Sequence, residues 1–234
     1  MRSLVLVMLA ACGGHGQSPG MGDGGPSDGG PLGDASPCAN GDVFLGGELV
    51  DWDSPDPTFL GVFMAKLSVS GLPGTILSTP PNGRLDVCVP QADPLRLDVD
   101  GPDDYLDGFM VVARDALQSL HPISMRDITM TRALSFYTEQ GLVFDPNKAH
   151  VLVFLAGDRS TITLDRAHGA PQAGNDDALP DTFVWTAGDS GRYVLFPNVD
   201  VTQPTGTIRD PLASHVVPLV AGKLTMVAVS FIFI

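Results

Sequence analysis

Short runs of alternating apolar and polar residues, separated by clusters of Pro, Gly and Asp, make up most of the chain from residue 38 onwards. Alternation with a period of two is typical of strands that bury one face. In the first half we expect strands at Val43–Val50, Leu60–Val69, Thr75–Leu77, Arg84–Val89 and Leu95–Val99. In the second half we expect them at Gly141–Phe144, His150–Ala156, Thr161–Leu164, Thr182–Thr186, Arg192–Phe196, His215–Val220 and Leu224–Phe233. The pattern predicts an all-β fold, with either one large antiparallel β-sandwich or two small ones.

The segment between the two sets of strands has a different pattern. Apolar residues recur there near helical spacing, at Met125, Ile128, Leu134 and Tyr137. Ser124 and Asp127 could form an N-terminal capping pair, and Gly141 stands where a helix would end. We therefore expect a short helix or an irregular connector at residues 121–140, between sandwich-like halves at residues 38–120 and 141–234.

The last run of the chain, residues 224–234, is apolar at both sets of alternating positions. A strand with one covered face instead shows a polar residue at every second position, as Leu95–Val99 does with Arg96 and Asp98. The final run therefore predicts a strand that is covered on both of its faces.

The two halves share short motifs that contain glycine. Gly47-Glu48-Leu49-Val50-Asp51 compares with Gly141-Leu142-Val143-Phe144-Asp145, and Asn82-Gly83-Arg84-Leu85 compares with Asp189-Ser190-Gly191-Arg192-Tyr193. At these residues the chain resembles the carboxypeptidase regulatory-like domains, which are small transthyretin-like sandwiches. The usual Thr-Asp-x-x-Gly turn of that family is replaced here by Thr79-Pro80-Pro81-Asn82-Gly83. The resemblance implies a repeated, non-catalytic accessory domain.

The first twelve residues have the features of a bacterial export signal. Arg2 supplies a positive charge, residues 4–9 form an apolar run, and small residues follow it. The sequence Leu9-Ala10-Ala11-Cys12 resembles the lipobox of bacterial lipoproteins. The resemblance implies that the signal peptide, residues 1–11, is removed and that Cys12 becomes an acylated, membrane-anchored N-terminus. The alternatives are an ordinary signal peptide with a chance cysteine, or a membrane-spanning helix, although a span needs about 20 apolar residues.

Glycines follow Cys12 directly, at Gly13 and Gly14. In many Gram-negative lipoproteins an aspartate at this place causes retention in the inner membrane, so we expect an outer-membrane anchor that faces the periplasm or the cell surface. Residues 12–37 combine the cysteine with a stretch rich in Gly, Ser, Pro and Asp that is too polar to build a core. We expect this stretch to be a disordered tether.

Two cysteines remain if Cys12 is acylated. Cys38 opens the folded region, and Cys88 lies in the strand-like run Leu85–Val89. In an oxidising periplasm they are a natural disulfide pair, which would join the N-terminal end of the folded region to an internal strand. The alternative is two buried free thiols.

Composition and charge narrow the choice of partners. The chain has 13 Lys and Arg against 27 Asp and Glu, which gives a formal net charge of −14. Binding to nucleic acid needs clustered basic residues that displace condensed counterions, so we exclude a nucleic acid partner. The expected partners are a membrane, reached through the lipid, and a protein or a glycan.

Few residues point to catalysis or to metal binding. The five histidines have no metal-ligand spacing, although His150 and His168 could meet in space. The chain has neither a Gly-x-Ser-x-Gly motif nor a glycine loop that opens a helix. Trp52 and Trp185 could stack on sugars, but we expect them in the core or at a sheet edge. Two clusters offer oxygen ligands for calcium without the spacing of a known calcium loop, namely Asp98, Asp100, Asp103 and Asp104, and Asn175, Asp176, Asp177 and Asp181.

We therefore expect a lipid-anchored protein of the cell envelope that binds or scaffolds a partner, without catalysis, cofactor or metal. The alternative is a small metal-dependent hydrolase or dioxygenase on a sandwich scaffold, which would use His150, His168 and nearby carboxylates. That alternative requires the two imidazoles to share one pocket, because the bonds of a metal ion to its ligands are only about 2 Å long.

Overall fold

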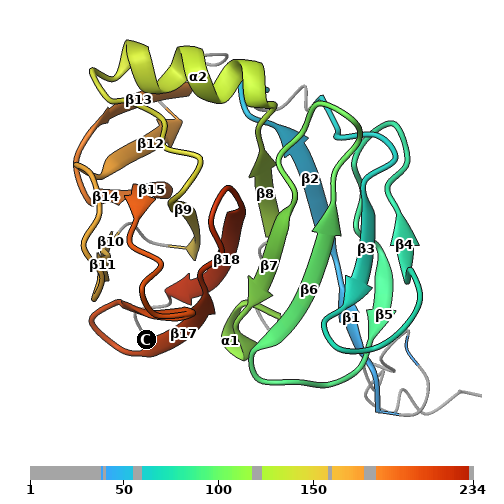
Figure 1. Cartoon of the computed structure of the whole chain (residues 1–234). Helices are drawn as coiled ribbons and strands as arrows, with labels where there is room; N and C mark the ends of the chain where they lie inside the picture. Colours follow the sequence, from blue (N-terminus) through green and yellow to red (C-terminus); the bar gives the residue numbers. More distant parts are fainter. Residues whose placement is uncertain are drawn as a thin grey trace, which may run out of the picture. The chain divides into compact units, whose positions relative to one another are not determined.

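The computed structural model describes residues 38, 41–54, 60–117, 123–157, 160–176 and 183–231. They all lie in the unit Ser36–Ile234. Strands predominate among these residues, and the two helices found there are short, α1 at Arg114–Leu117 and α2 at Met130–Glu139. Neither of these helices is long and apolar enough to cross a membrane. The predicted all-β fold is confirmed (Figure 1).

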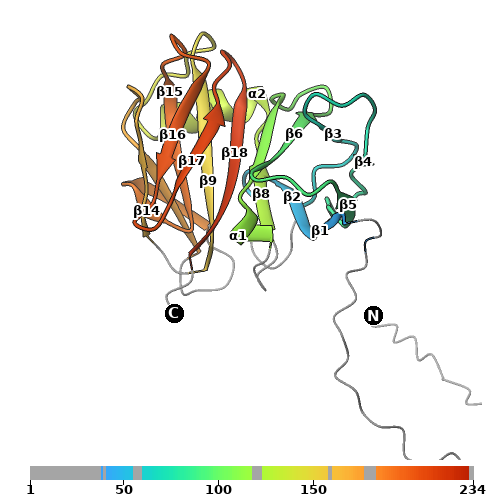
Figure 2. The ribbon, with the colours of Figure 1, turned by 90° about the horizontal axis from the view of Figure 1, so that it is seen from below.

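A nine-stranded sheet, called the central sheet below, runs through both of the predicted halves. From one edge to the other its strands are β13 (Phe183–Ala187), β12 (Gln172–Asp176), β15 (Tyr193–Val199), β9 (Ala149–Gly157), β18 (Leu224–Phe231), β7 (Gly108–Val112), β6 (Leu95–Asp100), β3 (Lys66–Val69) and β4 (Leu77–Ser78). The strand β18 lies between β9 and β7 and is parallel to both. Strands from residues 38–120 and from 141–234 therefore lie on either side of β18 in one sheet, as the view from below shows (Figure 2).

The residues of β18 explain its place in the middle of the sheet. Met226 and Ala228 pack into one hydrophobic core, whereas Val227 and Val229 pack into a second one. All four side chains are fully buried. Alternate residues of a strand point to opposite faces of its sheet, so a strand that is covered on both sides must be apolar at every position. The prediction that the last strand is covered on both faces is confirmed for β18.

Smaller sheets cover the two faces of the central sheet. They are β1 (Val43–Leu45) with β5 (Val87–Val89), β2 (Gly47–Asp51) with β8 (Ile123–Asp127), β10 (Ser160–Thr161) with β14 (Ser190–Gly191), and β11 (Thr163–Leu164) with β16 (Thr205–Arg209) and β17 (Ser214–Pro218). The second core lies beneath β11, β16 and β17, which contribute Leu164, Ile208 and Val217. The first core lies beneath α2, β1, β2, β5 and β8. The sandwich is not wholly antiparallel, because β2 and β8 are also a parallel pair.

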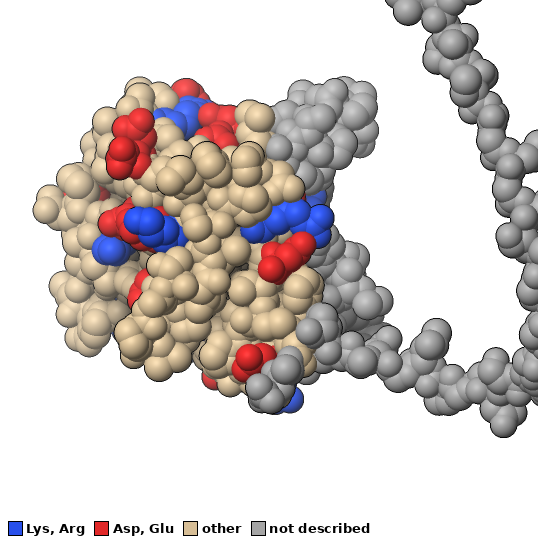
Figure 3. Space-filling model, turned by 90° about the vertical axis from the view of Figure 1, so that its right-hand side faces the viewer, with Lys and Arg blue, Asp and Glu red and all other residues tan. Residues whose placement is uncertain are grey.

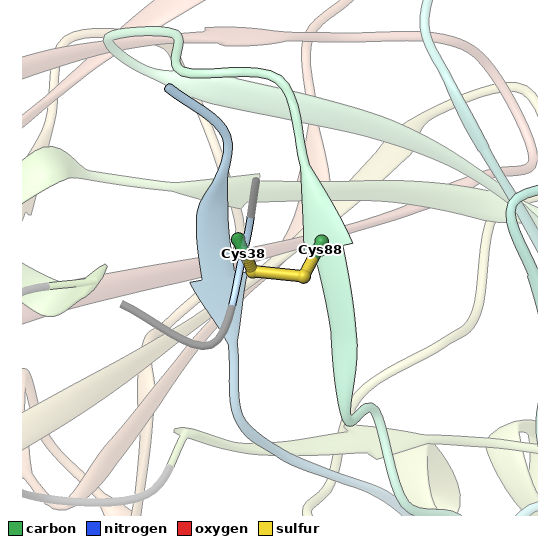
Figure 4. Close-up of a disulfide and its surroundings, with 2 residues drawn as sticks. All are labelled: Cys38 and Cys88. Carbon is green, nitrogen blue, oxygen red and sulfur yellow. A yellow bond between two sulfur atoms is a disulfide. The ribbon is translucent and has the colours of Figure 1, made fainter. Parts of the chain in front are cut away.

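Cys38 and Cys88 form the predicted disulfide, with 2.03 Å between the two sulfur atoms (Figure 4). Cys88 lies at the middle of β5, where it is the register partner of Phe44 in β1. The two cysteines are 50 residues apart in sequence. The start of the described chain is thus covalently joined to the strand that pairs with β1.

The predicted connector at residues 121–140 is a strand followed by a helix. Ile123–Asp127 forms β8, and all five of its residues are buried. The expected capping pair of Ser124 and Asp127 is wrong, because Thr129 is the N-cap of α2 and its hydroxyl accepts a 3.1 Å hydrogen bond from the Arg132 amide. A helix does end before Gly141, which has a φ of 70°.

Other strand predictions differ from the structure where the backbone has no continuous partner. Leu60–Val69 is a strand only at Lys66–Val69, since residues 60, 62 and 64 make single backbone hydrogen bonds to different neighbours. Gly141–Phe144 contains no strand, although the similar motif at Gly47–Asp51 forms β2. The motifs of the two halves are therefore not structurally equivalent at these residues. The pattern also did not predict β7, β8, β12 and β16.

Candidate functional site

The carboxyl ends of β2 and β8 bring two aspartates together. These strands run parallel, with Asp51 and Asp127 as register partners. The connection between β6 and β7 reaches the same place, because the Tyr105 hydroxyl donates a 2.7 Å hydrogen bond to Asp51 Oδ2. We call this end of the unit, together with α2, the distal end. It lies at the opposite end of β2 from the pair β1–β5 that carries the disulfide (Figure 1).

Asp127 is a carboxyl group that has no access to water. Its side chain is 0% exposed, Oδ1 accepts a 2.8 Å hydrogen bond from the Ile128 amide, and Oδ2 has no hydrogen-bond partner among the residues that the structure describes. Burial raises the pKa of Asp127 to about 8, with further contributions from the carboxylates of Asp107 and Asp51, although the bond from Ile128 lowers it. At neutral pH this carboxyl group therefore carries its proton.

Backbone hydrogen bonds fasten the connection between β6 and β7 to the start of α2. The Leu106 amide donates to the Ile128 carbonyl at 3.0 Å, and the Met130 amide donates to the Asp104 carbonyl at 2.8 Å. Tyr105 also forms an isolated β-bridge with the N-cap residue of α2. Burial and the bond to Asp51 raise the pKa of Tyr105, so its hydroxyl remains a hydrogen-bond donor.

Arg126 precedes Asp127 in β8, so its side chain points to the opposite face of that strand. Its Nη1 donates hydrogen bonds to the carbonyl oxygens of Trp52 at 3.0 Å and Ser54 at 2.8 Å. The guanidinium carbon lies 5.0 Å from the ring centre of Tyr193. A buried cation is tolerated only where hydrogen bonds and aromatic faces replace its water. Arg126 therefore holds the turn that follows β2.

A cluster of aromatic rings lies against α2. Trp52 and Trp185 stack with their ring centres 4.7 Å apart and 2° between their planes. Phe136 of α2 packs edge-on against both indoles, at 5.1 Å and 5.3 Å. Trp52 is buried and Trp185, on the edge strand β13, is half-buried. The expected core and edge positions of the two tryptophans are confirmed, and each indole faces another ring.

His150 lies at the start of β9, near the end of α2. Its Nδ1 is 2.6 Å from the Tyr137 hydroxyl and accepts a 3.4 Å hydrogen bond from the Asn198 amide, and its ring stacks on Phe144 at 4.4 Å. Because an amide can only donate, Nδ1 is an acceptor and the ring proton lies on Nε2. Burial lowers the pKa of His150 to about 4. The imidazole is therefore neutral at physiological pH and is used in packing.

The other histidines have separate surroundings. His168 Nδ1 is 2.6 Å from its neighbour's carbonyl oxygen, that of Gly169, and its ring packs against Phe196. His215 lies 3.3 Å from Asp210. Within the part of the chain that the structure describes, no group of three or more His, Cys, Asp or Glu side chains is arranged to hold a metal ion. His15 and His121 lie outside the described residues.

Among the described residues, the acidic side chains singled out from the sequence do not form compact groups of ligands. Asp98 accepts a 2.8 Å hydrogen bond from the Ser70 hydroxyl, and Asp100 lies 3.7 Å from Lys66 Nζ. On the side of the molecule that carries β3 and β4, charged side chains of both signs form small groups separated by uncharged surface (Figure 3). Of the second cluster, Asp177 and Asp181 lie outside the described residues. The predicted signal peptide, the predicted tether and the predicted lipidation site at Cys12 also lie outside them.

The paired carboxyl groups at the distal end were not predicted as a site. Asp51 and Asp127 are far apart in sequence, and only the parallel pairing of β2 and β8 makes them neighbours. One signal was present: Arg126 and Asp127 lie side by side between the apolar residues Met125 and Ile128. Two ionisable residues between buried positions indicate a strand whose polar side chains are used inside the fold.

Comparison with known protein families, with curated proteins and with solved structures finds no match to this chain. The resemblances to bacterial lipoproteins and to transthyretin-like domains therefore rest on the residues quoted for them.

Proposed function

We propose that this protein is a lipid-anchored component of the cell envelope that binds or scaffolds a partner through its distal end, without catalysis. The observation that carries the proposal is the place where the expected tether ends. Residues 12–37 would run from the acylated Cys12 to Cys38, and Cys38 is bonded to Cys88 in β5. A domain held in this way is attached at the β1–β5 end, which leaves the distal end free to meet a partner.

The chemically reactive side chains support a role without catalysis. Arg126, Asp127 and His150 are all buried, and each bonds to groups of its own chain. A general acid or base must come within hydrogen-bond distance of a substrate. Side chains that are occupied inside the fold instead maintain a fixed structure.

The surface that we propose for binding is the loop between β2 and β3, which starts at the distal end. The Asp51 amide donates a 2.8 Å hydrogen bond to the Leu60 carbonyl. Leu60, Phe63 and Met64 are 63%, 51% and 55% exposed. Neighbouring apolar side chains that remain exposed are typical of surfaces that bind other proteins. They favour a protein partner over a glycan, because both indole rings lie against other aromatic rings.

The described end of this loop, residues 60–65, is held by hydrogen bonds to Thr79, which follows β4. The Thr79 hydroxyl donates to the Val62 carbonyl at 2.5 Å and accepts from the Ala65 amide at 2.9 Å. Met64 has a φ of 66°, which is uncommon for a residue other than glycine. A loop that is ordered before binding loses less conformational entropy when a partner docks.

The anchor is tested by comparing wild type with Cys12→Ala. We expect wild type to enter the detergent phase of a phase-separating detergent and to incorporate a labelled fatty acid, and Cys12→Ala to do neither. Partitioning of wild type into water would overturn the anchor.

The binding face is tested by placing a photo-crosslinking residue at Phe63 in living cells, with the same residue at Val216 as the matched control. Val216 is also an exposed apolar residue, 46% exposed, but it lies on β17. A discrete adduct at position 63 with none at position 216 supports the proposal. Equal adducts at both positions, or none at either, would contradict it.

A further inference from the structure

We propose that Asp127 is a proton-sensitive switch: while its buried carboxyl group is neutral, the start of α2 stays bonded to the connection between β6 and β7, and its ionisation releases the start of α2. The inference concerns the folded unit only and goes beyond the proposed function. It does not depend on the lipid anchor or on the binding face.

The ionised form of Asp127 would face other negative groups. Asp51 is its register partner on β2. The charge of Asp107, at the end of the connection between β6 and β7, also raises the pKa of Asp127. Asp51 already accepts the hydroxyl of Tyr105, so that hydroxyl is not free to stabilise a second carboxylate. A charge at Asp127 would therefore be buried beside like charges.

The nearby cations have other partners. Arg126 points to the opposite face of β8 and bonds to carbonyl oxygens. Arg132 of α2 is paired with Asp53 and Glu139, and Lys223 lies 3.9 Å from Asp107. Among the ion pairs of the described residues, none includes Asp127. Ionisation can thus be accommodated only if the carboxylate reaches water, which requires local opening.

Opening at Asp127 would act directly on α2. The residue after it, Ile128, accepts the backbone bond from Leu106, and Thr129 and Met130 bond to the connection between β6 and β7. Movement of Asp127 toward water would break these contacts together. Phe136 would then lose its place against the indole of Trp52, so the tryptophan pair reports on the start of α2.

The direction of the pH effect follows from linkage. An exposed aspartate has a pKa of about 3.9, whereas burial raises the pKa of Asp127 to about 8 in the folded unit. At a pH between these two pKa values, Asp127 releases one proton when the start of α2 opens. The closed form is therefore favoured at low pH, and the equilibrium constant for opening should rise by up to about tenfold per pH unit until it levels off near pH 8.

The test is hydrogen exchange of the full-length protein in detergent from pH 5 to pH 9, with rates divided by those of an unstructured peptide at each pH. We expect the protection of residues 130–135 to fall steadily up to about pH 8, while β18 stays protected. Tryptophan near-ultraviolet circular dichroism should change over the same range. Loss of protection in α2 and β18 together would indicate global unfolding and would overturn the switch.

Variants identify the group responsible. Asp127→Asn should abolish the pH dependence of α2. Asp107→Asn removes an exposed charge that raises the pKa of Asp127, so protection should level off at lower pH and be higher at pH 9 than in wild type. Asp103→Asn, in the same connection, is the matched control and should follow wild type. A pH dependence of α2 protection that is retained in Asp127→Asn would refute the proposal. If Asp127→Asn does not fold, Asp107→Asn is the deciding variant, and a pH profile of α2 protection identical to that of wild type would refute the proposal.

Discussion

His150 and Asp127 are both kept uncharged at the distal end, and one physical cause acts on them in opposite directions. Burial disfavours the charged form of a group, so it lowers the pKa of His150 to about 4 and raises the pKa of Asp127 to about 8. Nδ1 of His150 and Oδ1 of Asp127 have hydrogen-bond partners. Nε2 of His150 and Oδ2 of Asp127 have none among the described residues. The folded state therefore depends on pH through both residues.

His150 should contribute a loss of stability in acid, opposite in sign to the contribution of Asp127, whose raised pKa favours the folded unit as the pH falls. The ordinary pKa of histidine is about 6.5, so below that pH the unfolded chain binds a proton that the folded unit does not. Stability that is present above pH 6.5 is then lost as the pH falls to about 4, by up to about 3 kcal/mol. His150→Asn should remove this loss. It should also cost about 2 kcal/mol at pH 7, because the ring no longer packs on Phe144.

Chemical denaturation at pH 7 and pH 4.5 measures the difference. His168→Asn is the matched control, since its ring lies against Phe196 elsewhere in the fold, and it should keep the wild-type difference between the two pH values. If stability changes between pH 7 and pH 4.5 by the same amount in His150→Asn as in wild type, His150 is not responsible for the predicted contribution.

At the scale of the element, α2 is a short helix that is attached at both ends. Thr129 caps its start, Arg132 pairs with Asp53 beyond β2, and the hydroxyl of Tyr137, near its end, bonds to His150. Helices of about this length are marginal by themselves in water, so these contacts and the buried face decide whether α2 forms. Its orientation over the aromatic cluster follows from both attachments.

Removal of the cap tests how much of this stability is local. Thr129→Ala leaves the Arg132 amide without the hydroxyl that accepts its hydrogen bond and should reduce the free energy of unfolding by about 1 kcal/mol. Thr138→Ala is the matched control, because the exposed Thr138 hydroxyl only donates to the Leu134 carbonyl within the helix and its loss should change stability by less than about 0.5 kcal/mol. Thermal and denaturant unfolding of both variants measure the difference, and equal effects would argue against a capping role.

The sequence predicted a short helix or an irregular connector here, and the face and the start of the helix were predicted only in part. Tyr137 is buried as expected, whereas Leu134, which had been placed on the same apolar face, is 52% exposed. Met125 belongs to β8 and not to the helix. Helical spacing was present by chance across the boundary, because the pairing of β8 with β2 depends on residues that are distant in sequence.

At the scale of the whole molecule, features that depend on local sequence could be predicted, whereas features that depend on pairing between distant residues could not. The composition of β18 indicated a strand that is covered on both faces, and this is a local property. Its insertion between β7 and β9 was not predictable, since it joins the two halves through contacts that no local pattern specifies. The paired carboxyl groups at the distal end are a product of the same kind of pairing, so their residues could be identified as polar but not as neighbours.

The disulfide is the long-range contact that the sequence did predict, because Cys38 and Cys88 are the two cysteines left to pair if Cys12 is acylated. A cross-link between residues 50 positions apart restricts the unfolded chain and should contribute about 4 kcal/mol to stability in the chain-entropy model. We expect the double variant Cys38→Ser and Cys88→Ser to fold but to lose about that amount, measured by denaturant unfolding.

Wild type in reductant should match the double variant, and the double variant itself should not respond to reductant. Removal of the disulfide should also loosen the β1–β5 end first. Because β1 and β5 pair over only three residues each, their amides should lose hydrogen-exchange protection before those of β18 do. A loss below about 1 kcal/mol would mean that the β1–β5 end is held by packing instead. In that case the tether would be attached to the domain through hydrophobic contacts around Leu45 and Val89, and the disulfide would contribute little to the strength of that attachment.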